Sequence, residues 1–140
     1  MTDFVLDCSV AMGWCFEDEA NAATESALEL LREGSAFVPP IWFLEIVNVL
    51  GMAERRRRIK KSDSIRFCAL LRSLPIFADS GSEAWEYAER VLSLSREHHL
   101  SAYDTAYLDL ALRRGLALAT RDQKLQTACR QAEVRLLLET

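Results

Sequence analysis

The sequence predicts a single α/β domain, in which a parallel sheet of about five strands is covered by helices on both faces. Short apolar runs of strand length alternate with longer segments of helical periodicity, and strands separated by helices are joined by crossovers that make them parallel. Half of the 140 residues are apolar, which is enough for one core and too few for two. We therefore expect residues 1–140 to form one domain.

Each predicted element rests on apolar spacing and on the residues that bound it. Strands are short continuous apolar runs, whereas helices carry apolar residues three or four positions apart. Ser62, Ser82 and Ser101 are suitable helix caps, and Gly34 and Gly115 are suitable helix ends. In chain order we expect a central first strand at 4–6, helix 21–32, strand 36–38, helix 41–57, helix 62–71, strand 76–78, helix 82–98, helix 102–114, strand 116–119, helix 122–131 and strand 134–137.

The composition argues against several classes of protein. No apolar stretch approaches the roughly 20 residues that a membrane-spanning helix needs, and the start MTDFVLDCSV has no basic leader. The four cysteines lack the C-x-x-C spacing of zinc sites, which fits buried thiols in a reducing compartment. We therefore expect a cytoplasmic protein that does not bind membranes.

Four carboxylates stand where predicted elements begin or end: Asp7, Glu45, Asp104 and Asp122. Asp7 and Asp122 follow strands, which places them at the carboxyl edge of the sheet, where the binding crevice of such folds lies. Structural roles compete with this interpretation. Asp7 suits a turn and Asp122 a helix N-cap, and Asp104 completes a capping box with Ser101.

Glu45 is the acid that structural roles explain least well. Its neighbours are apolar, namely Trp42, Phe43, Leu44, Ile46 and Val47. Burying an ionised acid without a partner costs several kcal/mol of folding free energy, unless the acid stays protonated. Asn48 lies three residues further on the same helix face. The pair indicates a polar pocket, with a solvated helix edge as the alternative.

A cation would explain why carboxylates gather at one place, because they otherwise repel one another. Oxygen ligands without His or Cys favour Mg²⁺ or Mn²⁺, and such ions activate water for phosphodiester hydrolysis. The net charge of −4 becomes zero when the four acids are left out. The charge therefore does not exclude RNA or DNA as a substrate.

Four motifs in order resemble the PIN domain, and most closely the VapC-type toxins of toxin–antitoxin pairs. They are VLDCSV at 5–10, EIVNVL at 45–50, SAYD at 101–104 with Tyr107 beyond it, and LATRD at 118–122 with Leu125 beyond it. The resemblance covers essentially the whole chain. It implies an Mg²⁺- or Mn²⁺-dependent endoribonuclease that forms a homodimer and binds an antitoxin protein near its active site.

The resemblance also assigns residues to the site. Its acidic metal site, which is also the catalytic site, corresponds to Asp7, Glu45, Asp104 and Asp122. Ser9 and Thr120 match hydroxyl positions that hold carboxylates or metal-bound water, and Asn48 matches a polar residue that often supports the glutamate. Cys8 stands where alanine is commoner, and no metal role is implied for it.

Other charged residues need separate interpretations. The basic run Arg55, Arg56, Arg57, Arg58, Lys60 and Lys61 exceeds what a helix C-terminus and solubility require. We expect it to contact the RNA backbone. Asp109 lies five residues beyond Asp104 and therefore points in a different direction from the helix. Arg113, four residues further on, is a better partner for it, so we leave Asp109 outside the site.

The competing function is a non-catalytic PIN-like module that binds RNA or protein. A phosphotransfer receiver module needs an adjacent acidic pair after the first strand, and a haloacid-dehalogenase-type phosphatase needs a second acid in place of Ser9. Neither pattern is present. The four acids favour a nuclease, whereas tight Mn²⁺ binding without RNA cleavage would favour the binding module.

Overall fold

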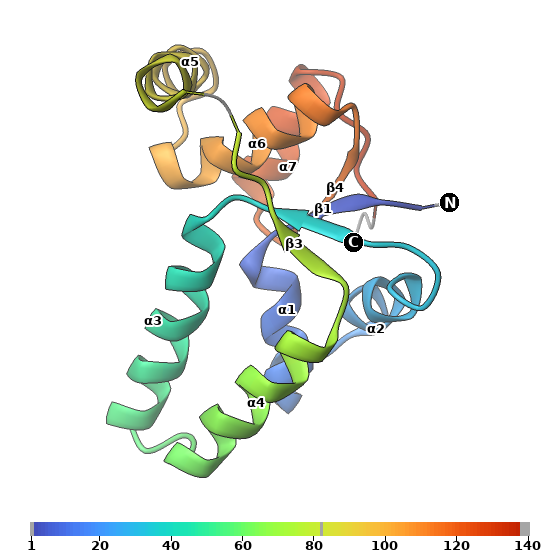
Figure 1. The fold of residues 1–140 in the computed structure, drawn as a ribbon, viewed down its shortest axis with the longest axis vertical. Helices are drawn as coiled ribbons and strands as arrows, with labels where there is room; N and C mark the ends of the chain where they lie inside the picture. Colours follow the sequence, from blue (N-terminus) through green and yellow to red (C-terminus); the bar gives the residue numbers. More distant parts are fainter. Residues whose placement is uncertain (1, 82, 138–140) are drawn as a thin grey trace.

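Four short parallel strands form the sheet at the centre of the molecule (Figure 1). The computed structural model describes residues 2–81 and 83–137. The strands are β1 (Phe4–Leu6), β2 (Ala36–Val38), β3 (Ile76–Ala78) and β4 (Ala117–Ala119), in the spatial order β3-β2-β1-β4. Val5 pairs with Phe37 on one side and with Leu118 on the other, which confirms the central position of the first strand.

The predicted fifth strand at 134–137 is reduced to a single parallel bridge between Leu136 and Leu118. The Leu118 amide donates to the Arg135 carbonyl at 2.9 Å, and the Leu137 amide donates to the Leu118 carbonyl at 3.0 Å. Glu133, with a φ of 59°, turns the chain in the left-handed region just before this segment. The described sheet has four strands where about five were predicted.

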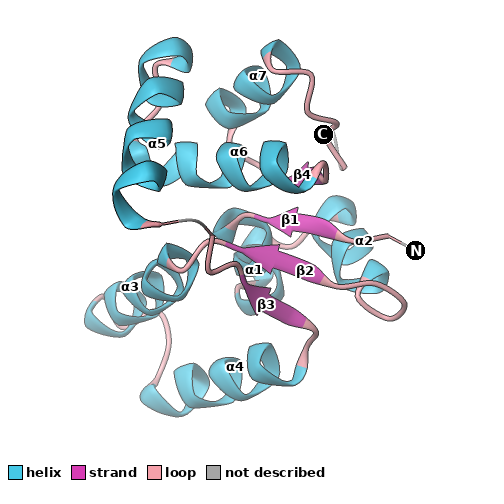
Figure 2. Ribbon diagram, turned by 45° about the horizontal axis from the view of Figure 1, so that its top comes forward, coloured by secondary structure: helices cyan, strands magenta, loops and turns pink. Residues whose placement is uncertain are grey.

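Helices cover both faces of the sheet, and none in the described residues is long and apolar enough to cross a membrane. They are α1 (Cys8–Cys15), the 3-10 turn η1 (Glu17–Glu19), α2 (Ala22–Leu30), α3 (Ile41–Arg55), α4 (Lys61–Ser73), α5 (Ala84–His98), α6 (Ala102–Arg114) and α7 (Gln123–Gln131). In Figure 2, α5, α6 and α7 lie together on one side of the molecule, and α3 and α4 lie on the other.

The ends of the helices test the predicted caps. Ser101 caps α6, with its Oγ accepting from the Asp104 amide at 3.1 Å, and Gly115 ends that helix at a φ of 64°. The predicted cap Ser62 is wrong, because α4 begins one residue earlier and Asp63 accepts from the Lys60 amide at 2.9 Å. The predicted cap Ser82 falls outside the described residues.

Gly34 does not end this helix as predicted, because α2 ends at Leu30 with Leu31 as its C-cap. It is absent from the described glycines with positive φ. A Cβ at this position would instead lie 1.9 Å from the Thr2 carbonyl oxygen, and the Gly34 amide donates to the Leu30 carbonyl at 3.0 Å. Close approach of the N-terminal segment, rather than a left-handed turn, therefore requires glycine here.

The core is centred on the sheet and on α6. The three residues of β1 and the three of β4 are buried, and α6 is buried from Thr105 to Ala111 without a break. Interiors of this kind are close-packed, so a helix buried in this way has little freedom to shift. Residues at the start of α6 are therefore held on a rigid support.

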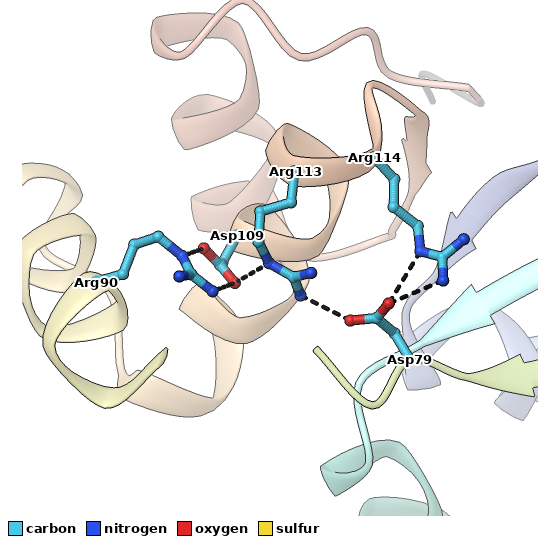
Figure 3. A network of polar contacts seen from close by, with 5 residues as sticks. All are labelled: Asp79, Arg90, Asp109, Arg113 and Arg114. Carbon is cyan, nitrogen blue, oxygen red and sulfur yellow. Dashed lines mark hydrogen bonds and ion pairs between the residues drawn. The ribbon is translucent and has the colours of Figure 1, made fainter. Parts of the chain in front are cut away.

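A network of ion pairs fastens α6 to α5 and to the end of β3 (Figure 3). Asp109 is 1% exposed and pairs with Arg90 of α5 and, at 2.9 Å, with Arg113. Arg113 also donates to Asp79 at 2.7 Å, and Arg114 donates to Asp79 at 3.0 Å. The predicted pairing of Asp109 with Arg113 is confirmed, and the network extends it to the sheet.

The network makes stability depend on pH. Burial disfavours the charged form of Asp79, but hydrogen bonds from Arg113 and Arg114 outweigh burial and lower its pKa. A lowered pKa stabilises the fold above the unfolded-state value of about 3.9, and this stabilisation is lost as pH falls through the folded-state pKa. We expect Asp79→Asn to lower the free energy of unfolding by about 1–3 kcal/mol near neutral pH.

Chemical denaturation of both proteins near neutral pH and below about pH 4 checks this expectation. The difference in free energy of unfolding between the wild type and Asp79→Asn should become smaller as the pH is lowered. An equal deficit at both pH values would contradict a contribution from the ionised carboxylate.

Candidate metal-binding site

The candidate site lies where the order of the strands reverses. The chain builds β2 and β3 on one side of β1 and then crosses to place β4 on the other. Asp7 follows β1 directly, and its amide donates to the Ala119 carbonyl, the last of β4, at 3.0 Å. Thr120 and Asp122 follow β4. The structure thus places these residues at the carboxyl edge between β1 and β4, the usual ligand crevice of such sheets.

Two hydroxyl groups hold the buried carboxylate of Asp7. Ser9 Oγ and Thr120 Oγ1 both donate to Asp7 Oδ2 at 2.7 Å. Each hydroxyl is itself oriented by a backbone amide, since Arg121 donates to Ser9 Oγ and Asp122 to Thr120 Oγ1, both at 3.0 Å. Among the described residues the hydrogen bonds to this side chain fall on Oδ2, which leaves Oδ1 for another ligand.

Glu45 projects from the second turn of α3 and meets a tyrosine of α6. Tyr107, which is fully buried, donates its hydroxyl to Glu45 Oε1. The predicted apolar surroundings of Glu45 are only partly correct, because Leu44 and Val47 are 63% and 53% exposed. Asn48, which was expected to support Glu45, is exposed and instead donates weakly to Met52 Sδ at 3.8 Å. The hydrogen bond to Glu45 comes from Tyr107.

Tyr107 was recognised in the sequence only as part of a motif, not as a site residue. Its place in the continuous buried stretch of α6 marks it as a core aromatic. A buried tyrosine hydroxyl needs a partner, which is the signal that could have drawn attention to it. Which partner it takes depends on the tertiary fold, since Glu45 lies 62 positions earlier.

Asp104 and Asp122 occupy helix starts, as their structural explanations predict. Asp122 caps α7, with Oδ1 accepting from the amides of Lys124 at 2.8 Å and Leu125 at 3.3 Å. Ser101 Oγ accepts from the Asp104 amide. Burial raises the pKa of the Asp104 carboxyl, and a side-chain hydrogen bond with Ser101 opposes this effect. The structure thus assigns Asp122 a definite capping role, while the Asp104 carboxylate remains half-buried at the first turn of α6.

The charges of the four acids act on one another. Burial is the largest cause that raises the pKa of Asp7, of Glu45 and of Asp104. The charges of Asp104 and Asp122 raise the pKa of Asp7 further, although hydrogen bonds from Thr120 and Ser9 oppose them. The charges of Asp7 and Asp104 likewise raise the pKa of Glu45, and the charge of Asp122 raises the pKa of Asp104. The structure brings the four predicted carboxylates into one electrostatic cluster.

The chemistry of this cluster fits a hard divalent cation. Its donors are carboxylate oxygens, the ligands that Mg²⁺ and Mn²⁺ prefer, and their mutual repulsion would be relieved by a positive ion. Within residues 2–81 and 83–137, no three Asp, Glu, His or Cys side chains are close enough to form a finished coordination group. A cation would therefore draw the carboxylates together or reach some of them through water, as Mg²⁺ commonly does.

The basic run lies at the far end of α3 from Glu45, about 15 Å along the helix axis at 1.5 Å per residue. Arg55, Arg56 and Arg57 are exposed. Arg58 differs from them, because it pairs with Asp18 at 3.1 Å and lies 4.5 Å from the centre of the Phe16 ring. These contacts give Arg58 a structural role in joining α3 to the segment around η1.

Removing one charge from the cluster should stabilise the metal-free protein. A raised pKa means that the ionised form of Asp7 is disfavoured in the folded state. We expect Asp7→Asn, whose amide oxygen can still accept from Ser9 and Thr120, to raise the free energy of unfolding in EDTA by about 1 kcal/mol at neutral pH. Added Mn²⁺ should stabilise the wild type and not the variant.

Thermal denaturation of both proteins, with EDTA and with Mn²⁺, measures these differences. Asp7→Asn should melt above the wild type in EDTA and below it in excess Mn²⁺. A variant that melts below the wild type in EDTA would indicate that the Asp7 charge is favourable in the fold.

Comparison with known proteins identifies the family of this fold. A similar fold is found in VapBC2 from Rickettsia felis bound to a DNA fragment from their promoter, with 14% identity, a TM-score of 0.69, and 96% of this chain and 97% of that chain covered. PAE2754 from Pyrobaculum aerophilum has 19% identity and a TM-score of 0.68, with 91% of this chain and 86% of that chain covered. A toxin–antitoxin complex from Klebsiella pneumoniae has 20% identity and a TM-score of 0.57, with 86% of this chain and 88% of that chain covered. No curated protein matches the chain in sequence at a significant level. The sequence model of the PIN domain matches residues 4–131, and the chain therefore belongs to the PIN domain family.

Proposed function

We propose that this protein is a metal-dependent endoribonuclease of the VapC toxin type. The observation that carries the proposal is the cluster of Asp7, Glu45, Asp104 and Asp122 at the strand-order reversal, in which burial and neighbouring acids raise the pKa values of Asp7, Glu45 and Asp104. Mutual repulsion disfavours the ionised form of such acids, and a bound cation would relieve it. Membership of the PIN domain family supports the same conclusion.

The residues have distinct roles in this proposal. Asp7, Glu45 and Asp104 bind Mg²⁺ or Mn²⁺, with Ser9 and Thr120 fixing the orientation of Asp7. Asp122 contributes its charge, or binds through water, while its Oδ1 caps α7. When bound, the cation lowers the pKa of a coordinated water and stabilises negative charge on the scissile phosphate. No protein nucleophile is required.

An antitoxin protein is the partner we propose, and a groove between α3 and α4 supports it. The two helices diverge in Figure 1, and the cavity between them has a volume of about 830 Å³. Its walls include Trp42, Phe43 and Ile65, and Trp42 is three residues from Glu45. An apolar antitoxin segment in this groove would lie beside the candidate site. Homodimer formation is also proposed, consistent with the exposed Trp85 on α5.

Removal of single site charges tests the nuclease. Asp7→Asn and Asp104→Asn should each reduce Mn²⁺-dependent cleavage of single-stranded RNA by about 100-fold or more, because each removes a ligand of the cation. Glu25→Gln is the matched control, since it removes an exposed acid from α2. The assay uses purified protein freed of metal with EDTA and then supplied with Mn²⁺.

Two results would contradict the proposal in different ways. Full activity in both Asn variants would show that the active site is elsewhere. Tight Mn²⁺ binding by the wild type without cleavage of any RNA would identify the chain as a non-catalytic binding module. Sequencing of RNA ends after pulsed expression, with Asp7→Asn as the control, identifies the target.

The basic run should contribute to RNA affinity by neutralising phosphates. We expect glutamine at Arg55, Arg56, Arg57, Lys60 and Lys61 to make the salt dependence of RNA binding shallower, by roughly 0.7 in log–log slope for each phosphate that the variant no longer neutralises. Arg58 is kept because of its contacts with Asp18 and Phe16. Binding is measured over a series of salt concentrations in an Asp7→Asn background, where RNA is not cleaved. An unchanged slope would reassign these residues to the surface or to partner binding.

A further inference from the structure

We propose that Tyr107 is a positioning residue for Glu45: its buried hydroxyl fixes Oε1 of the carboxylate and leaves Oε2 as the oxygen that binds the cation. This inference rests on the proposed metal-dependent function. It adds a residue of α6 that acts on the site through Glu45 rather than by touching the cation or the RNA.

The hydroxyl of Tyr107 is held in place by the core. Tyr107 is 0% exposed and lies in the middle of the buried stretch of α6, next to the fully buried Leu108. The ion-pair network at Asp109 fastens the following turn of this helix to α5 (Figure 3). Because close-packed side chains cannot rotate freely, the position of the hydroxyl is set by the fold and not by the carboxylate.

Among the residues that the structure describes, the Glu45 side chain accepts a hydrogen bond from Tyr107 alone. This side chain has three rotatable bonds, and the helix that carries it exposes the adjacent Leu44. The charges of Asp7 and Asp104 oppose its ionised form. The hydrogen bond from Tyr107 favours the ionised form of Glu45, and it joins α6 to α3 across the site.

The hydrogen bonds of Asp7 at the same site support this role of Tyr107. Asp7 is oriented by the hydroxyls of Ser9 and Thr120, both on one oxygen. Glu45 is likewise bonded through one oxygen, by the hydroxyl of Tyr107. Residues that orient metal ligands in this way change metal affinity or activity by about 10–100-fold when they are replaced.

An alternative explanation is that Glu45 merely satisfies a buried hydroxyl, as most buried polar groups are satisfied. In that case loss of the hydroxyl would change stability and leave metal affinity unchanged. A positioning role requires a change in metal affinity that depends on Glu45. The two explanations therefore differ in a measurable property other than activity.

The test compares Mn²⁺ dissociation constants of Tyr107→Phe and the wild type, measured by electron paramagnetic resonance on EDTA-stripped protein. We expect Mn²⁺ binding to weaken by about 10–100-fold, with the Mn²⁺ concentration for half-maximal RNA cleavage rising by a similar factor. Tyr103→Phe is the matched control, because Tyr103 is 62% exposed on the same helix, and it should bind Mn²⁺ as the wild type does.

A double-mutant comparison separates a positioning role from a structural one. Tyr107→Phe should weaken Mn²⁺ binding little further in a Glu45→Gln background, because its effect passes through Glu45. Equal weakening in both backgrounds would overturn the proposal, and so would wild-type affinity in Tyr107→Phe. A wild-type protein that binds no Mn²⁺ would overturn both this inference and the proposed function. Mn²⁺ binding with failed RNA cleavage would contradict the nuclease alone.

A measurement on the wild type covers the case in which Tyr107→Phe does not fold. Carbon-13 at the tyrosine Cζ gives one NMR signal for each of the three tyrosines. The signal of buried Tyr107 should shift as Mg²⁺ binds to Glu45, while that of exposed Tyr103 stays in place. An unmoved Tyr107 signal at saturating Mg²⁺ would overturn the proposal.

Discussion

The hydrogen bond between Asp7 and Thr120 joins residues 113 positions apart, and the geometry of the candidate site depends on it. It forms because β1 and β4 are adjacent parallel strands whose carboxyl ends meet at the strand-order reversal. Through Thr120 it also orients the amide of Asp122, at the start of α7. One contact thus links the first strand, the fourth strand and the last described helix at the point where the acids gather.

The chain holds its buried acids Asp7, Asp79 and Asp109 and the half-buried Glu45 in two ways. Asp79 and Asp109 are held by arginines, which bring positive charge and fasten α5, α6 and the sheet together. Asp7 and Glu45 are held by hydroxyls, which fix an oxygen without bringing any charge. The first arrangement stabilises the fold by itself. The second leaves a negative field that disfavours ionisation, and this supports the proposed binding of a cation.

Rigid support of the site comes from the distribution of the core. Asp104 and Tyr107 lie on the helix with the longest buried stretch, and Asp7 follows a strand that is entirely buried. Glu45 lies on α3, whose exposed Phe43 and Val47 line the proposed partner groove. In the proposed function, α3 therefore carries both a wall of the partner groove and a ligand of the cation.

The sequence predicts what local patterns determine and misses what tertiary contacts determine. Strand residues 4–6, 36–38 and 76–78 coincide with the apolar runs, and the pairing of Asp109 with Arg113 follows from their spacing of four. Helix α1 has no polar face to mark its period, because Val10 to Gly13 are all buried.

Contacts between distant segments explain the remaining errors. Gly34 is required by the approach of Thr2, and the predicted fifth strand makes only one bridge to β4, between Leu136 and Leu118, in the described residues. The four acids could be proposed as a group from the order of their motifs. The hydroxyl of Tyr107 beside Glu45 could not, because nothing local pairs residues so far apart.

Anomalous diffraction from crystals of the wild-type protein grown with Mn²⁺ tests the central claim most directly. The account predicts a manganese peak enclosed by Asp7, Glu45 and Asp104, with oxygen ligands at the distances that divalent cations require. A peak bound elsewhere on the chain, or none at saturating Mn²⁺, would contradict it.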